Sequence, residues 1–244
     1  MSEAKPNPRT IHKMRVAKIV DYNPQIRELF IETEEPSEFR FKAGQFVMLH
    51  VPEEGKPKPA LRAYSIASSH DNKKGFQLIF KSVENGLASN YVWALKGGET
   101  LNFTGPFGRV FFVEPPTEQI MFLNTGSGVS QHLSYMLSFK DQYPDVRYRM
   151  LFGVRHEADI YYKPQLEELK KSFKDFEYHF VLSRPPESWS GKKGYVQTLM
   201  HEFNYEQIQT TFYLCGNGAM IKDAKALLEQ SSIPKERIWA EAFD

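Results

Sequence analysis

The sequence predicts two domains: an antiparallel β-barrel over residues 1–114, and a doubly wound α/β domain with a parallel five-stranded sheet over residues 117–244. Before residue 114, short alternating or apolar segments are separated by turn residues, which is typical of a small barrel. After residue 117, apolar runs alternate with stretches of helical spacing, which indicates a parallel sheet wound with helices. Pro115-Pro116-Thr117 separates the two patterns and is the expected domain boundary.

The first domain is expected to begin with a loose arm, residues 1–10, and then to consist almost entirely of strands. Alternation or apolar character predicts strands within residues 14–20, 29–33, 43–51, 61–68, 76–81 and 100–103. Residues 52–59 are rich in proline and charge, so we expect a surface loop there. Gly105-Pro106-Phe107-Gly108 is expected to end the last strand. One segment differs, because Gly86 to Leu95 has helical spacing and Gly97-Gly98 closes it.

The second domain is expected to alternate strands and helices. Continuous apolar runs, as in buried parallel strands, predict strands at residues 120–123, 148–152, 178–182, 212–215 and 238–240. Helices are predicted around Leu133, Met136 and Leu137, around Leu166, Leu169 and Phe173, over residues 196–203, and around Ile221, Ala224 and Leu228. In such sheets, ligands bind at the carboxyl ends of the strands, beside the switch in strand order.

Composition excludes several classes of protein. A net charge of +1 argues against binding nucleic acid through its phosphates. The single cysteine, Cys215, excludes an internal disulfide and a cysteine-ligated iron–sulfur cluster, and no metal site is expected. The polar start shows no signal peptide, and no apolar run approaches the roughly 20 residues that span a bilayer. We therefore expect a cytoplasmic protein without a membrane span, and a monomer, although the sequence carries no signal of oligomeric state.

The segment Leu61 to Ser68 concentrates groups that suit a phosphate and a flat ring. Alternate side chains of a strand share a face, so Arg62 and Tyr64 point the same way and Ser65 the other, unless the strand ends there. A guanidinium binds phosphate in bidentate fashion, and a tyrosine ring can stack on a heteroaromatic. An ordinary strand with an exposed arginine is an equally good interpretation of these residues alone.

Arg62-Ala63-Tyr64-Ser65 resembles the R-x-Y-S flavin motif of the ferredoxin–NADP reductase family. The resemblance implies that these four residues bind FAD, with Ser65 bonded near flavin N5. Gly86-Leu87-Ala88-Ser89 resembles the G-x-x-[ST] segment that holds the FAD pyrophosphate in that family, and helix starts suit phosphate. A diphosphate favours FAD over FMN. A plain connector with Ser89 as the helix cap is the alternative.

Two strand ends of the second half resemble the nucleotide-binding segments of the same family. Thr125-Gly126-Ser127-Gly128 resembles its T-G-x-G-x-x-P turn, which implies that Thr125, Gly126 and Gly128 bind the nucleotide; Gln131 stands in place of the proline. Gly153-Val154-Arg155 resembles its G-x-R, whose arginine approaches the nucleotide. A surface Arg155 paired with Glu157 or Asp159 is the alternative.

The third strand end bears on the choice of nucleotide. Ser183, Arg184, Lys193 and Tyr195 resemble the family residues that bind the 2′-phosphate and adenine, and a phosphate dianion needs such donors and cations. The resemblance therefore favours NADPH. The stretch Pro185 to Gly191 also resembles that of NADH-using oxygenase reductases, so NADH stays open.

The last two segments imply the reacting centre. Cys215, Gly216 and Met220 resemble the family's C-G-x-x-x-M, whose cysteine lies beside the nicotinamide; alone, a cysteine ending an apolar strand is usually a core residue. The resemblance assigns Glu241 to the acidic position near the C-terminus and Phe243 to the aromatic that covers the flavin until nicotinamide displaces it. Ser65, Cys215, Glu241 and Phe243 are thus the expected catalytic residues.

The implied function is hydride transfer from NADPH to the N5 atom of bound FAD, followed by single-electron transfer to a carrier protein, with ferredoxin or flavodoxin as the family default. Since the chain cannot ligate its own cluster, an iron–sulfur carrier must be a separate protein. Two alternatives stay open: the NADH-using reductase component of an oxygenase system, and a non-catalytic flavin-bearing subunit or nucleotide sensor.

Overall fold

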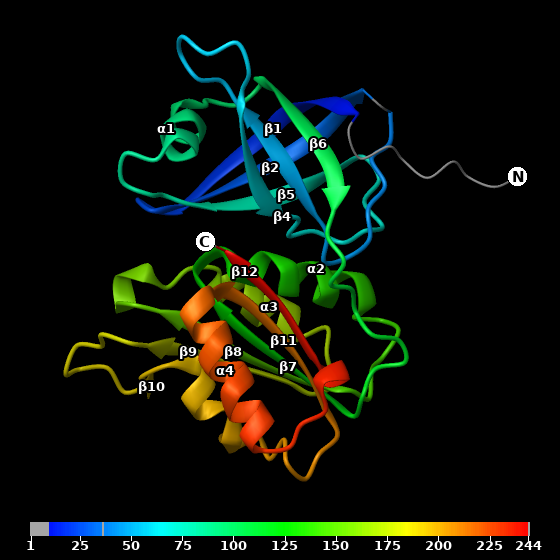
Figure 1. Ribbon diagram of the computed structural model, residues 1–244, viewed down its shortest axis with the longest axis vertical. Coiled ribbons are helices and arrows are strands. Elements are labelled where there is room, and N and C mark those ends of the chain that lie inside the picture. Colours follow the sequence, from blue (N-terminus) through cyan, green and yellow to red (C-terminus); the bar gives the residue numbers. More distant parts are fainter. Residues whose placement is uncertain (1–9, 36, 244) are drawn as a thin grey trace, which may run out of the picture. The chain divides into compact units, whose positions relative to one another are not determined.

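The computed structural model describes residues 10–35 and 37–243, and the chain divides into two compact units between Phe111 and Phe112 (Figure 1). The predicted loose arm falls on residues 1–10 and so lies, apart from Thr10, outside the described residues, as does Asp244. The predicted limits of the two cofactor domains, residues 114 and 117, stay a prediction.

The first unit is a six-stranded antiparallel sheet with the order β4-β3-β6-β1-β2-β5. Its elements are β1 (Ile11–Asn23), β2 (Ile26–Glu35), β3 (Phe46–Val51), β4 (Ala60–Ser65), β5 (Gly75–Lys81), α1 (Leu87–Ala94) and β6 (Thr100–Phe107). An antiparallel bridge between Ile66 and Leu78 joins the two ends of this order and closes the sheet. Alternate residues of β1, such as Met14 and Val16, are fully buried and fill the interior.

The first unit differs from the prediction at the end of one strand, and it also excludes the alternative of Ser89 as the helix cap. The strand that was expected to end at Gly105 continues as β6 through Phe107, because Phe46 of β3 still pairs with Phe107. Gly86, not Ser89, is the residue that precedes the first turn of α1, and no side chain caps that turn.

The second unit is a six-stranded parallel sheet with the order β10-β9-β8-β7-β11-β12. Its strands are β7 (Gln119–Thr125), β8 (Arg147–Val154), β9 (Phe176–Leu182), β10 (Lys192–Lys193), β11 (Thr210–Asn217) and β12 (Ile238–Phe243). The helices are η1 (Gly126–Gly128), α2 (Val129–Phe139), η2 (Glu157–Asp159), α3 (Lys163–Lys170), η3 (Val196–Phe203), α4 (Gly218–Gln230) and η4 (Lys235–Arg237). The order reverses between β7 and β11, so the carboxyl ends of these two strands form the switch point where ligands bind in doubly wound sheets.

Both faces of the parallel sheet are covered, which explains its continuous apolar strands. On one face, Met121 of β7 and Leu214 of β11 belong to one core with residues of η3 and α4; Figure 1 shows α4 lying across the sheet. On the other face, Phe122 of β7 and Tyr213 of β11 contact the ring of Tyr135 on α2. Successive residues of each strand therefore face opposite layers.

The prediction of an antiparallel sheet followed by a doubly wound parallel sheet is confirmed, with three corrections in the second unit. The sheet has six strands instead of five, because Lys192 and Lys193 pair with the end of β9. Residues 196–203 form a 3-10 helix. Phe173 lies beyond the end of α3, where it packs against the rings of Tyr148 and Phe176.

Two features that would point to other kinds of protein are absent from the described chain. Within residues 10–35 and 37–243, no helix is long and apolar enough to cross a membrane. The same residues contain no group of three or more histidine, cysteine, aspartate or glutamate side chains that could hold a metal ion.

Candidate functional site

Strand β4 presents the side chains of the arginine–tyrosine–serine motif at an edge of the first sheet. Arg62 pairs with Leu49 and Tyr64 with Val47, so the two motif side chains share a face, as predicted. The Arg62 guanidinium is exposed, and among the described residues it donates to the carbonyl of the neighbouring Leu61. The Tyr64 ring lies 4.3 Å from that of Phe80, centroid to centroid, and burial raises the pKa of its phenol to about 12. Ala63, between them, is exposed.

Ser65 carries a buried hydroxyl group. The residue is only 4% exposed, and its Oγ has no hydrogen-bond partner in the part of the chain that the structure describes. A buried hydroxyl without a partner costs free energy, because it has lost its hydrogen bonds to water. The position therefore fits a ligand atom that would complete the bond, such as a ring nitrogen.

The start of α1 is arranged as an anion site with free backbone donors. The first N–H groups of a helix have no partner within it, and here no side chain caps them. Ser89 Oγ accepts the Val83 N–H at 2.8 Å, which ties down the preceding loop and leaves the Ser89 hydroxyl proton to donate. Ala88 and Leu87 pack against the core of the first unit.

In the second unit, the turns after β7 and β11 pack directly against each other at glycine residues. A Cβ on Gly128 would lie 2.3 Å from the Cys215 carbonyl oxygen, and one on Gly216 would lie 2.3 Å from Thr125 Oγ1. That Thr125 oxygen accepts the Asn217 N–H at 2.9 Å. The glycines thus bring the start of α2 against the end of β11, and backbone groups remain open to a ligand at the switch point.

The turn itself has a backbone that few residues adopt. Gly126 has a φ of +53°, and its carbonyl accepts the Tyr161 hydroxyl at 3.0 Å. Gly153, at the end of β8, is also tightly packed, because a Cβ there would lie 3.0 Å from Thr125 Cγ2 and that methyl group would have to shift. Neither Tyr161 nor the packing of Gly153 could be anticipated from the glycine pattern.

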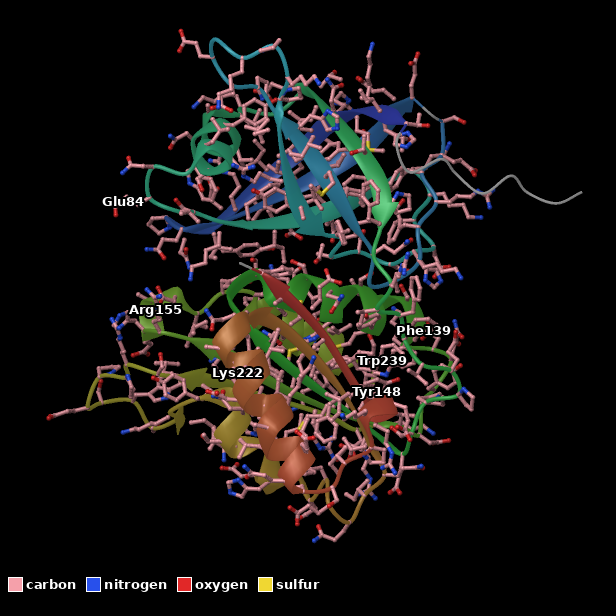
Figure 2. All side chains as sticks on the ribbon, in the orientation of Figure 1. Glu84, Phe139, Tyr148, Arg155, Lys222 and Trp239 are labelled. Atoms are coloured by element: carbon pink, nitrogen blue, oxygen red, sulfur yellow. The ribbon has the colours of Figure 1, made fainter. Side chains whose placement is uncertain are left out.

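The carboxyl ends of β8, β9 and β10 bring three cationic side chains together. Backbone bonds link the segments: Ser183 N–H donates to the Val154 carbonyl and Arg184 N–H to the Arg155 carbonyl. Arg155 (labelled in Figure 2), Arg184 and Lys193 are exposed, and none has a side-chain ion pair within the described residues. The alternative of Arg155 paired with Glu157 or Asp159 is therefore not observed. Tyr195 follows and is 63% exposed, so its ring is open to stack on a purine.

The neighbouring charges and the tryptophan loop have structural partners instead. Lys192 pairs with Glu202, so its charge is already compensated. Trp189 Nε1 donates to the Lys192 carbonyl at 3.0 Å, and a Cβ on Gly191 would lie 2.5 Å from the Trp189 ring. The tryptophan and glycine of residues 185–191 therefore have a local packing role.

One row across the second sheet carries polar side chains toward α2. Asn124 of β7, Cys215 of β11 and Glu241 of β12 lie at the same register, so they share a face. Burial, followed by the nearby Glu241, raises the pKa of the Cys215 thiol well above its usual value. Burial likewise raises the pKa of the Glu241 carboxyl, against the Gln131 amide, which donates to Glu241 Oε2 at 3.1 Å.

A buried histidine completes this row. His132 Nδ1 lies 3.3 Å from Asn124 Oδ1, and burial lowers the pKa of the imidazole to about 3, so the ring is neutral. Its Nε2 atom has no hydrogen-bond partner in the described chain. The layer between the sheet and α2 is therefore polar, with a neutral imidazole beside the thiol of Cys215 and the carboxyl of Glu241.

The remaining predicted residues lie at the ends of the same strands. Phe243 ends β12 in register with Asn217 and is partly exposed. Met220 is buried in the first turn of α4, where its N–H donates to the Asn217 side chain. Asn217 is the cap of α4 and was missed, although asparagine between a strand and a helix is a start signal. Gln131 as the partner of Glu241 was also missed, because no sequence pattern links residues so far apart.

This donor set fits two phosphate-bearing ligands with flat rings. In the first unit, the unsatisfied Ser65 hydroxyl, the exposed Arg62 guanidinium and the uncapped start of α1 fit a flavin nucleotide. In the second unit, the glycine turn and the unpaired cations fit a nicotinamide nucleotide. Hydride transfer between a nicotinamide nucleotide and a flavin nucleotide requires that one protein bind both.

Comparison with known proteins agrees with this division. Residues 13–112 match a family model described as an oxidoreductase FAD-binding domain, and residues 122–226 match one described as an oxidoreductase NAD-binding domain. Ferredoxin–NADP reductase B of Sorangium cellulosum is 32% identical over 239 residues, which cover 94% of this chain and 96% of that protein. The glycine betaine monooxygenase reductase subunit of Pseudomonas aeruginosa is 28% identical, and the chain spans only 64% of its length.

Solved structures share the fold. A ferredoxin–NADP⁺ reductase from Neisseria gonorrhoeae with bound FAD and NADP superposes with a TM-score of 0.80 at 21% identity, over 95% of this chain and 98% of that one. The Amycolatopsis cytochrome P450 reductase GcoB superposes with a TM-score of 0.87 at 23% identity, over 96% of this chain and 70% of that one.

Proposed function

Because the chain belongs to the ferredoxin–NADP reductase family, we propose that this FAD-dependent oxidoreductase takes its hydride from NADPH and passes electrons singly to ferredoxin or flavodoxin. The observation that supports NADPH is the cluster of Arg155, Arg184 and Lys193, which lies at the carboxyl ends of the strands without ion pairs within the described residues. Exposed cations without partners are the groups that a phosphate dianion requires.

In the first unit, we assign the flavin to β4 and the start of α1. Arg62, Leu87, Ala88 and Ser89 bind the pyrophosphate, Gly86 lets the chain approach it, and Ala63 offers backbone groups at the sheet edge. Tyr64 stacks on the ring, and Ser65 satisfies its buried hydroxyl on a ring nitrogen. When bound, FAD accepts a hydride as an electron pair and releases the two electrons one at a time.

In the second unit, we assign the nucleotide to the switch point. Thr125, Gly126, Gly128 and Gly216 shape the turn that receives the pyrophosphate; Ser183, Arg184, Lys193 and Tyr195 bind the 2′-phosphate and adenine, while Arg155 approaches the nucleotide. Cys215, Glu241 and Met220 face the nicotinamide. Phe243 keeps the role that the resemblance implies, covering the flavin until nicotinamide displaces it. The residues act chiefly by positioning, since holding the donor and acceptor atoms together is a large catalytic term.

A second candidate is the NADH-using reductase component of an oxygenase system. The similarity to a monooxygenase reductase subunit and to an anthranilate dioxygenase electron transfer component favours it. The chain spans 64% and 58% of those proteins. With one cysteine, the chain would need a separate iron–sulfur protein in either case. We expect the working protein to be a cytoplasmic monomer.

The test is anaerobic mixing of the flavin-loaded protein with NADPH and, separately, with NADH, while the flavin absorbance is followed. Faster bleaching by NADPH supports the first candidate, and equal or faster bleaching by NADH supports the second. A protein that binds FAD but is bleached by neither nucleotide would be a non-catalytic subunit. A protein that does not bind FAD would refute the assignment of β4.

A further inference from the structure

The hydrogen bond between Gln131 and Glu241 joins two elements that are far apart in the chain. Gln131 lies in the first turn of α2 and has no exposed surface, while Glu241 lies on β12. The Gln131 Nε2 donates to Glu241 Oε2 at 3.1 Å. The bond is partly buried, since Gln131 is fully buried and Glu241 is partly exposed, so water competes for it less than for a bond at the surface.

The position of the donor is fixed by the packing beneath it. Gly128, three residues before Gln131, touches the Cys215 carbonyl so closely that a Cβ would lie 2.3 Å from its oxygen. Cys215 pairs in register with Glu241. The packing of α2 against β11 and the pairing of β11 with β12 therefore fix the position of the donor, Gln131, relative to the acceptor, Glu241. Two side chains at the surface would not be held in this way.

The other titratable groups of this layer stay neutral. Burial raises the pKa values of Cys215 on β11 and Tyr135 on α2 well above their ordinary values, and the nearby Glu241 adds to both shifts. His132 on α2 is neutral because burial lowers its pKa to about 3. Of these groups, Glu241 is the carboxyl, and its pKa is raised above its ordinary value by burial. Burial favours the protonated form of the Glu241 carboxyl and raises its pKa, whereas the hydrogen bond from the Gln131 amide favours the carboxylate and lowers the pKa.

A charge at Glu241 matters for the proposed reaction. With both cofactors bound, hydride transfer would carry an electron pair from the nicotinamide to the FAD and would leave a positive charge on the nicotinamide ring. A carboxylate beside the ring stabilises that charge, and a protonated carboxyl does not. The family pattern has a proline at position 131, and proline has no side-chain donor. The hydrogen bond from the residue at this position to Glu241 is therefore a feature of the present chain and not of the family pattern.

Resting on the proposed function, we propose that Gln131 is a positioning residue for hydride transfer: its amide holds the Glu241 side chain in one orientation and in its carboxylate form beside the nicotinamide. Gln131 gives up no proton. It acts only through Glu241.

The matched pair of variants is Gln131→Met and Gln119→Met. The first removes the amide at nearly constant volume. The second removes another buried amide of the same unit, which donates to the Phe203 carbonyl at 3.1 Å and to Thr210 Oγ1 at 3.0 Å, at the opposite end of β7 from Asn124. Both variants lose stability through a lost buried bond, and only the first touches Glu241.

Two readouts separate positioning from stability. In flavin-loaded protein without nucleotide, ¹³C NMR of labelled glutamate carboxyls, assigned with Glu241→Gln, follows the protonation of Glu241. The titration midpoint moves to higher pH in Gln131→Met and stays in place in Gln119→Met. In anaerobic mixing with the nucleotide, the acid limb of the flavin-reduction rate moves to higher pH in Gln131→Met. Its rate at neutral pH falls about tenfold, which corresponds to about 1.4 kcal/mol.

The outcomes are distinct from those for the proposed function. Wild-type protein that is not bleached by either nucleotide refutes the proposed function, whatever the NMR midpoint. Wild-type protein that is bleached, with an unchanged midpoint and pH profile in Gln131→Met, refutes the role of Gln131 alone. Gln131→Asn, whose amide is one methylene short of Glu241, serves if the methionine variant does not fold, and it should give the same direction of shift.

Discussion

Replacing Gly128 with alanine tests whether the close approach of α2 to β11 builds the nucleotide turn. The backbone at Gly128 has φ −59° and ψ −19°, which alanine adopts without strain. Alanine is also the better helix former, by up to about 1 kcal/mol. Only the contact opposes the change: the new Cβ would lie 2.3 Å from the Cys215 carbonyl oxygen and 2.6 Å from its carbon, whereas real Cβ contacts stay above 3.0 Å.

The relief of this contact must move backbone, because both atoms belong to the main chain of β11. Overpacking of this kind typically costs about 1–3 kcal/mol, so we expect a net loss of about 1–2 kcal/mol after the gain in helix propensity. The start of α2 would move away from β11, and the N–H groups aimed at the pyrophosphate would move with it. Each such donor that loses its bond weakens nucleotide binding by about tenfold.

The assays are urea unfolding and calorimetric titration with NADPH. The matched control is Gly55→Ala, where a Cβ would meet nothing within 4 Å but φ is +73°. The control should lose about 1–2 kcal/mol through its backbone alone and bind NADPH as the wild type does. Gly128→Ala with wild-type stability and wild-type NADPH affinity would refute the reasoning.

Three further predictions concern the charges and rings of the site. Arg184→Ala should weaken NADPH binding at least tenfold and leave NADH binding unchanged, as measured by titration; equal losses for both would remove Arg184 from the 2′-phosphate. Phe243→Ala should alter nucleotide affinity and the rate of flavin bleaching while FAD stays bound, and loss of FAD would make Phe243 a structural residue. The pKa of His132 is lowered to about 3 by burial, so below its unfolded value of 6.5 the unfolded state binds the extra proton and stability falls as the pH falls. In urea unfolding, His132 should make the protein about 2 kcal/mol less stable at pH 5 than near neutral pH. The variant His132→Gln should lose this difference. An unchanged pH dependence of stability in that variant would contradict the assignment.

Much of the fold follows from patterns that are local in the sequence. Alternation in β1 and the apolar runs of β7 and β11 are properties of a few consecutive residues, and the glycines after β7 signal a turn wherever they occur. β10 could not be predicted in the same way. It contains only Lys192 and Lys193, and it is a strand because β9 lies beside it, which no local pattern records.

The site divides along the same line. The R-x-Y-S and T-G-x-G segments are each contiguous, so the sequence alone is enough to locate them. The burial of the Ser65 hydroxyl, the contact of Gly128 with Cys215 and the bond from Gln131 to Glu241 depend on chain segments that meet only in the folded protein. In the sequence, Gln131 is noticeable only because it replaces the proline of the family pattern. Only the folded structure shows that its amide bonds Glu241.

The pairing of charges separates structural residues from those proposed to bind ligands. Arg27 bonds Asp21 at 2.7 Å and also the Val92 carbonyl at the end of α1, and Arg149 bonds Asp175 at 2.7 Å. Arg155 and Arg184, within the described ranges, have no such partner. An exposed arginine without a partner adds little to stability, since even a surface ion pair is worth at most about 1 kcal/mol. Selection for stability alone would therefore not favour Arg155 and Arg184 over neutral residues. Replacing Arg27 or Arg149 with a neutral residue should therefore lower stability and leave nucleotide affinity unchanged. Replacing Arg155 or Arg184 should lower nucleotide affinity and leave stability unchanged.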